Sequence, residues 1–194
     1  MTSCVFNTNE ESYLKKDLTQ SKIMNKKLLF VNQAEELGLI QQMAYTIRMS
    51  DLDIHPSKTC FLCVSPDYSA ITAQLLSHLL SEDGEIYHIE SVNVPFPDED
   101  SANYREDFKN LYRKLLSRWE NFVLIEAGVI RGGNYSWICT IMKAMSDKKF
   151  YTTTLFENLD SNFLSDIVCK YYDNNEKDLH FWWEQPNNHW KFYG

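Results

Sequence analysis

The chain has 194 residues and an ordinary apolar content, which suits one domain with a sizeable core. Its formal net charge is −8 and no long basic run offsets it, so nucleic-acid binding is disfavoured, and no apolar stretch is long enough to cross a membrane. The five cysteines, without a secretory signal, favour reduced thiols, and we expect a cytoplasmic protein.

The first half of the chain alternates strand and helix patterns after a polar start. Residues 1–26 are weakly periodic, and we expect them to form an N-terminal arm ahead of a single domain over residues 27–194. Asn32 followed by Glu35 is typical of a helix N-terminus. The expected elements are a strand at 27–31, a helix from Asn32 to about Ser50, a strand at 59–64, a turn at 65–69, a helix at 70–80 and a strand at 85–94.

The second half of the chain continues the alternation. An acidic, proline-bearing segment at 95–100 precedes it. Phe122–Ile125 is continuously apolar, as expected of a central parallel strand. The expected elements are an amphipathic helix at 101–119, a strand at 122–125, a glycine-bearing loop at 128–134, a helix at 135–145, a strand at 150–156, a helix at 163–172 and a strand at 179–183.

This alternation predicts an α/β fold, with a mainly parallel twisted sheet, helices on both faces and a small C-terminal aromatic element. Ligands of such folds bind at the carboxyl ends of the strands. Two strand ends are followed by polar or glycine-bearing segments, one after Val64 and one after Ile125. We therefore expect the functional site at these two strand ends.

The second of these segments carries the strongest site pattern. Glu126 follows the strand, where its carboxylate can accept hydrogen bonds from sugar hydroxyls or contact a metal. Gly132 and Gly133 permit backbone angles and a close approach that other residues do not. The N–H groups from Gly132 to Ser136, together with Arg131, suit a phosphate. A plain strand–turn–helix connection with glycine at the bend is an equally good interpretation of the local pattern.

The segment from Phe122 to Ser136 resembles the phosphoribosyl-pyrophosphate (PRPP) motif of type I phosphoribosyltransferases, which are glycosyltransferases. Phe122–Ile125 matches the apolar strand of that motif, Glu126 its first acid and Gly132 its glycine. Asn134 falls where Thr or Ser is usual, and the order of elements agrees from about residue 28 to 185. The resemblance implies the family's fold, a catalytic role for Glu126 in orienting the ribose, and Mg²⁺ as cofactor. It places the 5-phosphate at Arg131, Gly132, Gly133, Asn134, Tyr135 and Ser136.

Two departures from the family pattern concern the reaction. Ala127 replaces the second acid of the motif. The family's mobile catalytic loop corresponds to residues 93–104, which are acidic and have no basic residue before Arg105. A pyrophosphate leaving group needs cationic or metal help, and we expect no metal site built from protein ligands alone.

The turn formed by Pro66, Asp67, Tyr68 and Ser69 corresponds to the family's pyrophosphate-contacting loop. Its backbone N–H groups, the Ser69 hydroxyl and the Asp67 carboxylate could contact a ligand or its magnesium. Alternatively, the segment is an ordinary helix N-terminal turn with Asp67 as the cap.

The aromatic tail at 180–190 also has two interpretations. Its rings could stack on a nucleobase, since the corresponding region of the family often serves the base. Alternatively, Phe181 and Trp183 close the core while Trp182 and Trp190 dock a partner.

Cys60 and Cys63 have the spacing of a redox or zinc motif. They fall in a predicted strand, where residues three apart face opposite sides, and no second Cys or His pair accompanies them. We expect both to be core residues.

Two functional hypotheses follow. The first is a divergent phosphoribosyltransferase that transfers phosphoribose from PRPP to an unknown acceptor. The second is a non-catalytic module that senses a nucleotide or binds a partner. Both require a ribose-phosphate or nucleotide ligand, and the aromatic residues are compatible with a protein partner or a homo-oligomer.

Overall fold

The computed structural model describes residues 27–81, 84–94 and 101–184. The predicted N-terminal arm at 1–26, the acidic segment at 95–100 and the end of the aromatic tail, with Trp190, lie outside these residues. Among the described helices, none is long and apolar enough to cross a membrane.

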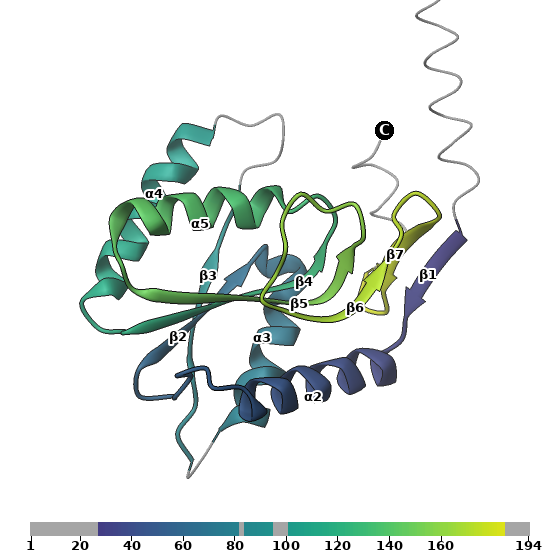
Figure 1. Ribbon diagram of the computed structural model, residues 1–194, viewed down its shortest axis with the longest axis horizontal. Helices are drawn as coiled ribbons and strands as arrows, with labels where there is room; N and C mark the ends of the chain where they lie inside the picture. The colour runs from purple at the N-terminus through teal and green to yellow at the C-terminus, as the bar shows by residue number, and fades with distance from the viewer. Residues whose placement is uncertain (1–26, 82–83, 95–100, 185–194) are drawn as a thin grey trace, which may run out of the picture.

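A five-stranded parallel sheet forms the centre of the fold (Figure 1). The strands are β2 (Thr59–Val64), β3 (His88–Val92), β4 (Asn121–Val129), β5 (Lys149–Asn158) and β6 (Ile167–Tyr172). Their order is β3-β2-β4-β5-β6, and every neighbouring pair is parallel. The predicted α/β class is confirmed, and β4, nearly all of whose nine residues are buried, lies at the centre.

Helices cover both faces of this sheet. Figure 1 shows the helices in two layers, α4 (Ser101–Leu116) and α5 (Gly133–Met145) above the sheet and α2 (Gln33–Met49) and α3 (Pro66–Leu80) below it. Successive residues of β4 point to opposite faces. Phe122 and Leu124 therefore pack with residues of α4 and α5, whereas Val123 and Ile125 pack with residues of α2 and α3.

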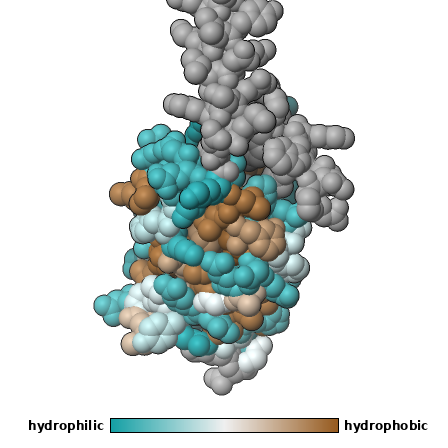
Figure 2. All heavy atoms as spheres, turned by 90° about the vertical axis from the view of Figure 1, so that its right-hand side faces the viewer, coloured by the Kyte–Doolittle hydropathy of each residue, from teal (hydrophilic) through white to brown (hydrophobic). Residues whose placement is uncertain are grey.

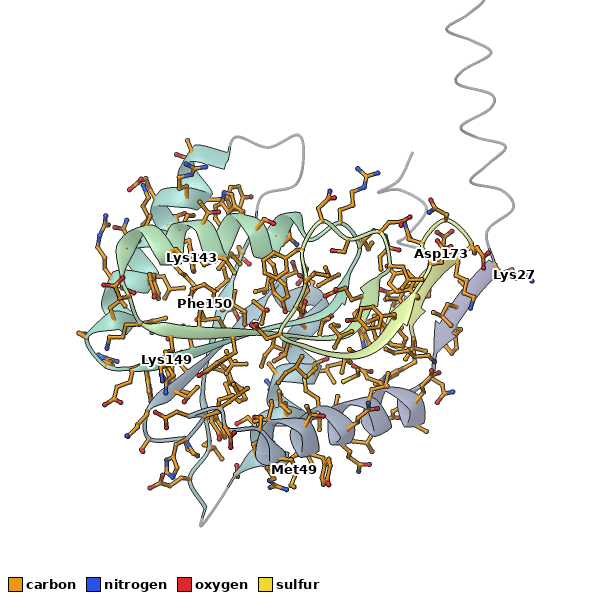
Figure 3. The ribbon with its side chains drawn as sticks, in the orientation of Figure 1. Lys27, Met49, Lys143, Lys149, Phe150 and Asp173 are labelled. Atoms are coloured by element: carbon orange, nitrogen blue, oxygen red, sulfur yellow. The ribbon has the colours of Figure 1, made fainter. Side chains whose placement is uncertain are left out.

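Side chains fill the space between these layers, as Figure 3 shows. In the upper layer, the Lys143 ammonium lies 5.8 Å from the centre of the Phe150 ring. The two cysteines of β2 divide between the layers, since Cys60 belongs to the α4/α5 cluster and Cys63 to the α2/α3 cluster. Burial raises the pKa of both thiols to about 12, so the prediction that they are core residues is confirmed.

The two ends of the described chain meet in a second sheet of two strands. β1 (Lys27–Val31) pairs in parallel with β7 (Lys177–Phe181), and Figure 1 shows the pair at the right-hand side of the molecule. The small sheet packs closely on β4. A Cβ added to Gly128 would lie 2.9 Å from the Leu179 Cδ2 atom, so a larger residue at this position would displace Leu179.

A buried carboxylate fixes the residues that follow β7. Glu36, in the first turn of α2, is 2% exposed. Its Oε2 accepts hydrogen bonds from the indole N–H groups of Trp182 at 2.6 Å and Trp183 at 3.2 Å, and its Oε1 accepts one from the Thr72 hydroxyl at 3.4 Å. Burial raises the pKa of Glu36, and these hydrogen bonds act in the opposite direction. Together with the burial of Phe181, they favour the interpretation of the tail as core packing.

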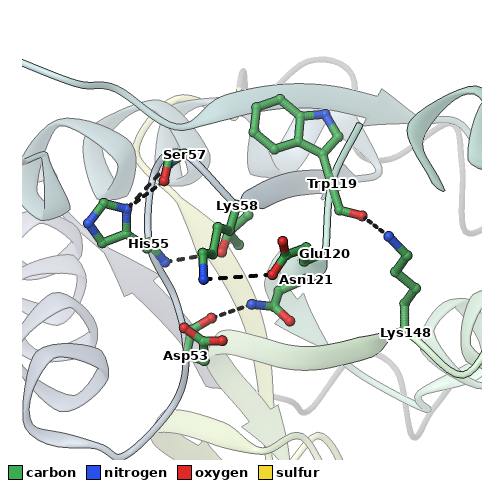
Figure 4. A network of polar contacts seen from close by, with 9 residues as sticks. Asp53, His55, Ser57, Lys58, Trp119, Glu120, Asn121 and Lys148 are labelled. Atoms are coloured by element: carbon green, nitrogen blue, oxygen red, sulfur yellow. Dashed lines mark hydrogen bonds and ion pairs between the residues drawn. The ribbon is translucent and has the colours of Figure 1, made fainter. Parts of the chain in front are cut away.

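Polar contacts join the loops at the amino ends of the strands (Figure 4). The Asn121 side-chain amide donates to the Asp53 carbonyl at 2.5 Å, and the Lys148 ammonium donates to the Trp119 carbonyl at 2.6 Å. These contacts close the edge of the sheet opposite to the one where the site is expected.

The predicted helix at 163–172 is wrong, because this segment contains β6 after an irregular stretch. Apolar residues recur here at spacings that fit a helix as well as a half-buried edge strand. Hydrogen bonds to neighbouring strand residues decide the outcome. The Ser165 N–H donates to the Glu157 carboxylate at 3.0 Å, and the Asp166 carboxylate accepts from the Thr152 N–H at 2.7 Å.

Several element boundaries also differ from the expectation, among them those of the helix expected at 101–119, which ends at Leu116, and of the strands expected at 85–94 and 179–183, which are His88–Val92 and Lys177–Phe181. The helix expected from residue 70 begins at Pro66, because proline is readily accepted at the first helical position. β4 continues beyond Ile125 to Val129, and Gly128 pairs with Phe156 of β5. The glycine-bearing loop is therefore short, and α5 starts at Gly133. The Asn32 cap is confirmed, with its side chain accepting the Glu35 N–H at 2.9 Å.

Replacing Glu36 by Ala is expected to lower the free energy of unfolding by about 2 kcal/mol, because two indoles and a hydroxyl lose their acceptor. The matched control is Glu35→Ala, which removes a more exposed carboxylate paired with Lys170 and should cost less than about 1 kcal/mol. Urea denaturation of both variants measures the difference. Equal losses would show that the indole contacts contribute no stability.

Candidate functional site

The candidate site lies at the carboxyl edge of the central sheet, where α3 and α5 begin. Because β2 and β4 are neighbours, the segments that follow them lie side by side. A hydrogen bond joins the two segments, with the Asn134 side-chain amide donating to the Ser65 hydroxyl at 3.3 Å. The structure thus brings together the two strand ends singled out in the sequence.

Glu126 is a buried carboxylate beside the N-terminus of α5. It is 7% exposed, and its Oε1 accepts a hydrogen bond from the Asn134 amide at 3.0 Å. Burial raises the pKa of the Glu126 carboxyl to about 7, and the bond from Asn134 acts in the opposite direction. Glu126 lies one residue beyond the last β2–β4 pair, and a carboxyl whose pKa lies near neutrality in such a place is a typical functional-site feature.

The two glycines of the loop have different roles. Gly132 has a φ of +74° and is the N-cap of α5. A Cβ at this position would lie 2.2 Å from the Phe163 Cβ, so both backbone angle and packing require glycine. Gly133 is exposed, and apart from its neighbours in the chain and its own helix backbone no atom of the described residues lies within 4 Å of a Cβ added there. The backbone is thus exposed at Gly133, while Gly132 shapes the turn.

The first turn of α5 presents backbone donors. The N–H groups of the first helical residues, Gly133 to Tyr135, have no intrahelical acceptor, whereas the Ser136 N–H donates to the Gly132 carbonyl at 2.9 Å. The Tyr135 side chain lies in the core, where its hydroxyl donates to the Thr153 carbonyl at 2.5 Å. The Ser136 and Arg131 side chains are exposed. Backbone N–H groups and one guanidinium are therefore available to an anion.

The predicted pyrophosphate-side turn forms the first turn of α3. Pro66 begins the helix, Tyr68 lies in this turn, and Asp67 is exposed. Ser69 is fully buried, and its Oγ accepts the Ala127 N–H at 3.0 Å. This hydroxyl therefore fastens α3 to β4. The cap is Ser65, without a side-chain cap bond, so the alternative with Asp67 as cap is wrong.

Sequence reasoning missed Ser65 as a site residue. It is the only non-glycine residue of the described chain with a positive φ, at 53°, and its hydroxyl meets Asn134. Its N–H donates to the Val92 carbonyl of β3 at 3.2 Å. Nothing in the local sequence distinguishes a serine in this conformation, since the angle results from α3 beginning directly after β2.

The residues present do not fit a resident magnesium site. Magnesium in phosphate sites takes oxygen ligands from one or two carboxylates and from the substrate. Here Ala127, at the position of the second acid, is fully buried in the α2/α3 cluster and offers no oxygen. Within residues 27–81, 84–94 and 101–184, no group of three or more His, Cys, Asp or Glu side chains could coordinate a metal ion.

Neither a protein-family profile nor a curated protein sequence matches the chain. Solved structures do. The purine phosphoribosyltransferase of Pyrococcus horikoshii Ot3 matches with a TM-score of 0.57 at 15% identity, over 83% of this chain and 95% of that chain. The xanthine-guanine-hypoxanthine phosphoribosyltransferase of Helicobacter pylori matches with 0.57 at 13%, over 84% and 95%. The HGPRT-ase of Leishmania tarentolae, in complex with GMP, matches with 0.57 at 17%, over 78% and 84%. The fold is therefore type I phosphoribosyltransferase-like.

The two adjacent glycines allow a direct stability test. Gly132→Ala is expected to lower the free energy of unfolding by about 2 kcal/mol or more, because the new methyl group meets Phe163 in a left-handed conformation. Gly133→Ala, whose methyl group enters open space, should change it by less than about 0.5 kcal/mol. Chemical denaturation distinguishes them, and a similar cost at both positions would contradict the assignment.

The buried Glu126 predicts a pH dependence. Its pKa is raised from 4.5 in the unfolded chain to about 7 in the folded protein, so folding takes up a proton between these values. The stability from this group is fully present below the unfolded pKa and is lost as the pH rises through the folded pKa. Glu126→Gln removes this loss.

The free energy of unfolding of the variant should match that of the wild type near about pH 4 and exceed it, by on the order of 3 kcal/mol, near about pH 8. Urea denaturation of both proteins at the two pH values measures this difference. Since other carboxyls titrate in both proteins, only the difference between them reports Glu126. A difference that does not change with pH would contradict the raised pKa.

Proposed function

We propose that this phosphoribosyltransferase-like fold binds a phosphorylated ribose or nucleotide at the segment 126–136. The observation that carries the proposal is a buried carboxylate, Glu126, next to the amino end of α5. The Glu126 carboxylate offers acceptors for sugar hydroxyls, and the N–H groups at the start of α5 offer donors for a phosphate. Together they match the two kinds of polar group in a ribose phosphate.

Each residue then has a definable role. The N–H groups of Gly133, Asn134 and Tyr135 bind the phosphate oxygens, and Arg131 adds a charged donor from the exposed loop. Glu126 accepts hydrogen bonds from sugar hydroxyls through the oxygen that Asn134 does not contact. Asn134 positions this carboxylate and links it to Ser65.

Transfer of phosphoribose from PRPP to an acceptor is one use of such a site. The match of Glu126 to the first acid of the family motif supports it, as does the similarity to structures named as phosphoribosyltransferases. In this use, magnesium would have to come with the diphosphate of the substrate. Glu126 would orient the ribose for attack at its anomeric carbon.

Nucleotide sensing or partner binding without catalysis is the second candidate. The burial of Ala127 in the core supports it, because the second acid is absent. The small sheet also exposes apolar side chains, with Leu28 63% and Phe30 53% exposed, and Figure 2 shows hydrophobic residues gathered on that face of the molecule. Such a patch suits a protein partner or a second copy.

Calorimetric titration with ribose 5-phosphate, and with PRPP in the presence and absence of Mg²⁺, tests the proposal. Arg131→Ala should weaken binding by about tenfold or more through loss of a charge-assisted hydrogen bond. Arg118→Ala is the matched control, since Arg118 is also exposed but precedes the amino end of β4, and its removal should leave affinity unchanged. Equal effects, or no binding by the wild type, would refute the assignment.

Turnover separates the two uses of the site. With PRPP and a panel of nucleobases, the transferase interpretation predicts product formation that Glu126→Ala abolishes. Saturable binding without product across the panel favours the sensing interpretation.

A further inference from the structure

We propose that the site binds a 5′-nucleoside monophosphate without a divalent cation, in preference to a magnesium-bound diphosphate such as PRPP. This inference rests on the function proposed above and specifies its ligand class. It follows from the set of charged groups that the fold places at the carboxyl edge of the sheet.

One of the two oxygens of the Glu126 carboxylate already accepts a hydrogen bond from the protein. Glu126 Oε1 accepts the Asn134 amide at 3.0 Å, and the same amide nitrogen reaches the Ser65 hydroxyl at 3.3 Å. This pair of contacts fixes the carboxylate with a neutral donor. A magnesium ion demands a nearly octahedral set of oxygens, and a carboxylate oxygen shared with an amide N–H is a poor member of that set. A sugar hydroxyl needs only the free oxygen.

A small movement of the chain cannot bring another oxygen ligand to the position of the motif's second acid. Ala127 is fully buried, and its N–H donates to the Ser69 hydroxyl at 3.0 Å. The following residue, Gly128, is pressed against Leu179 of the small sheet, where an added Cβ would lie 2.9 Å from Cδ2. The two residues that follow Glu126 are thus both packed against other parts of the protein. No oxygen ligand can enter at position 127 without opening the core.

The positive charge of the site is suited to one phosphate. The N–H groups at the start of α5 and the exposed Arg131 belong to the segment that follows β4. A phosphate monoester carries about two negative charges at neutral pH, which a helix N-terminus and a guanidinium can stabilise. On the side where the resemblance places pyrophosphate, the first turn of α3 presents the exposed Asp67 carboxylate. A diphosphate there would face repulsion that a monophosphate avoids.

Calorimetry of the full chain with AMP, GMP, CMP and UMP, each in magnesium buffer and in EDTA, tests the inference. At least one monophosphate should bind, and its Kd should agree within about twofold between the buffers. PRPP should bind more weakly than that monophosphate even with magnesium. A Kd that rises about tenfold or more in EDTA, or tighter binding of PRPP with magnesium, would overturn the inference while leaving the ribose-phosphate site intact. If no ribose phosphate binds in either buffer, the proposed function itself fails.

Glu126→Gln supplies an independent test, since it keeps an acceptor for Asn134 and removes the charge that a metal would require. The variant replaces the oxygen that accepts the sugar hydroxyls by an amide NH2 group, so its Kd for the same monophosphate should rise by the same factor, within about threefold, in both buffers. Loss of about tenfold or more in magnesium buffer alone would reveal a metal bridge between Glu126 and the ligand. The expected stability of this variant at neutral pH excludes unfolding as the cause of such a loss, and a denaturation curve checks it.

Discussion

The Ala127 N–H donates a hydrogen bond to the Ser69 hydroxyl at the point where the pairing of β2 with β4 ends. The last paired residues are Cys63 and Ile125, and beyond them the first turn of α3 takes the place of β2 beside β4. This contact lets β4 continue to Val129 while remaining paired with β5 on its other side. It also brings the start of α3 next to the start of α5. The arrangement of the site depends on this change, in which the helix α3 replaces the strand β2 as the neighbour of β4.

The replacement of β2 by α3 beside β4 also explains why the pKa of Glu126 is raised. With α3 covering one face of the β4 end and α5 covering the other, Glu126 loses most of its contact with water and meets no basic side chain among its recorded partners. A carboxyl group in such surroundings costs stability when it ionises. Chains retain such costs chiefly at functional positions, where a group ready to accept or donate a hydrogen bond is useful. Here an amide, rather than a second acid or a base, orients it.

Patterns within a single element predicted much of this molecule. The apolar run Thr59–Val64 and the cap at Asn32 are decided by neighbours in the chain, and both were found as expected. The error at 163–172 arose because Asp166 and Glu157 act through partners on another turn or strand, which no local pattern contains. Near the site, the glycine turn before α5 was predicted, but Glu126 lies within β4 and not at its end. The left-handed Ser65 and the different demands on Gly132 and Gly133 depend on tertiary packing against α3 and Phe163.

The pairing of β1 with β7 sets the order in which the molecule can be completed during synthesis. Lys27 pairs with Lys177, so the first of the described strands has no partner until nearly all of the described chain has followed it from the ribosome. The five parallel strands from β2 to β6 are all synthesised in that interval. The nascent protein must therefore keep the unpaired edge of β1, and Val31, which the folded core buries, away from other chains while its centre is already assembling. Closure of the small sheet is a late, long-range step that joins the first described strand to the last.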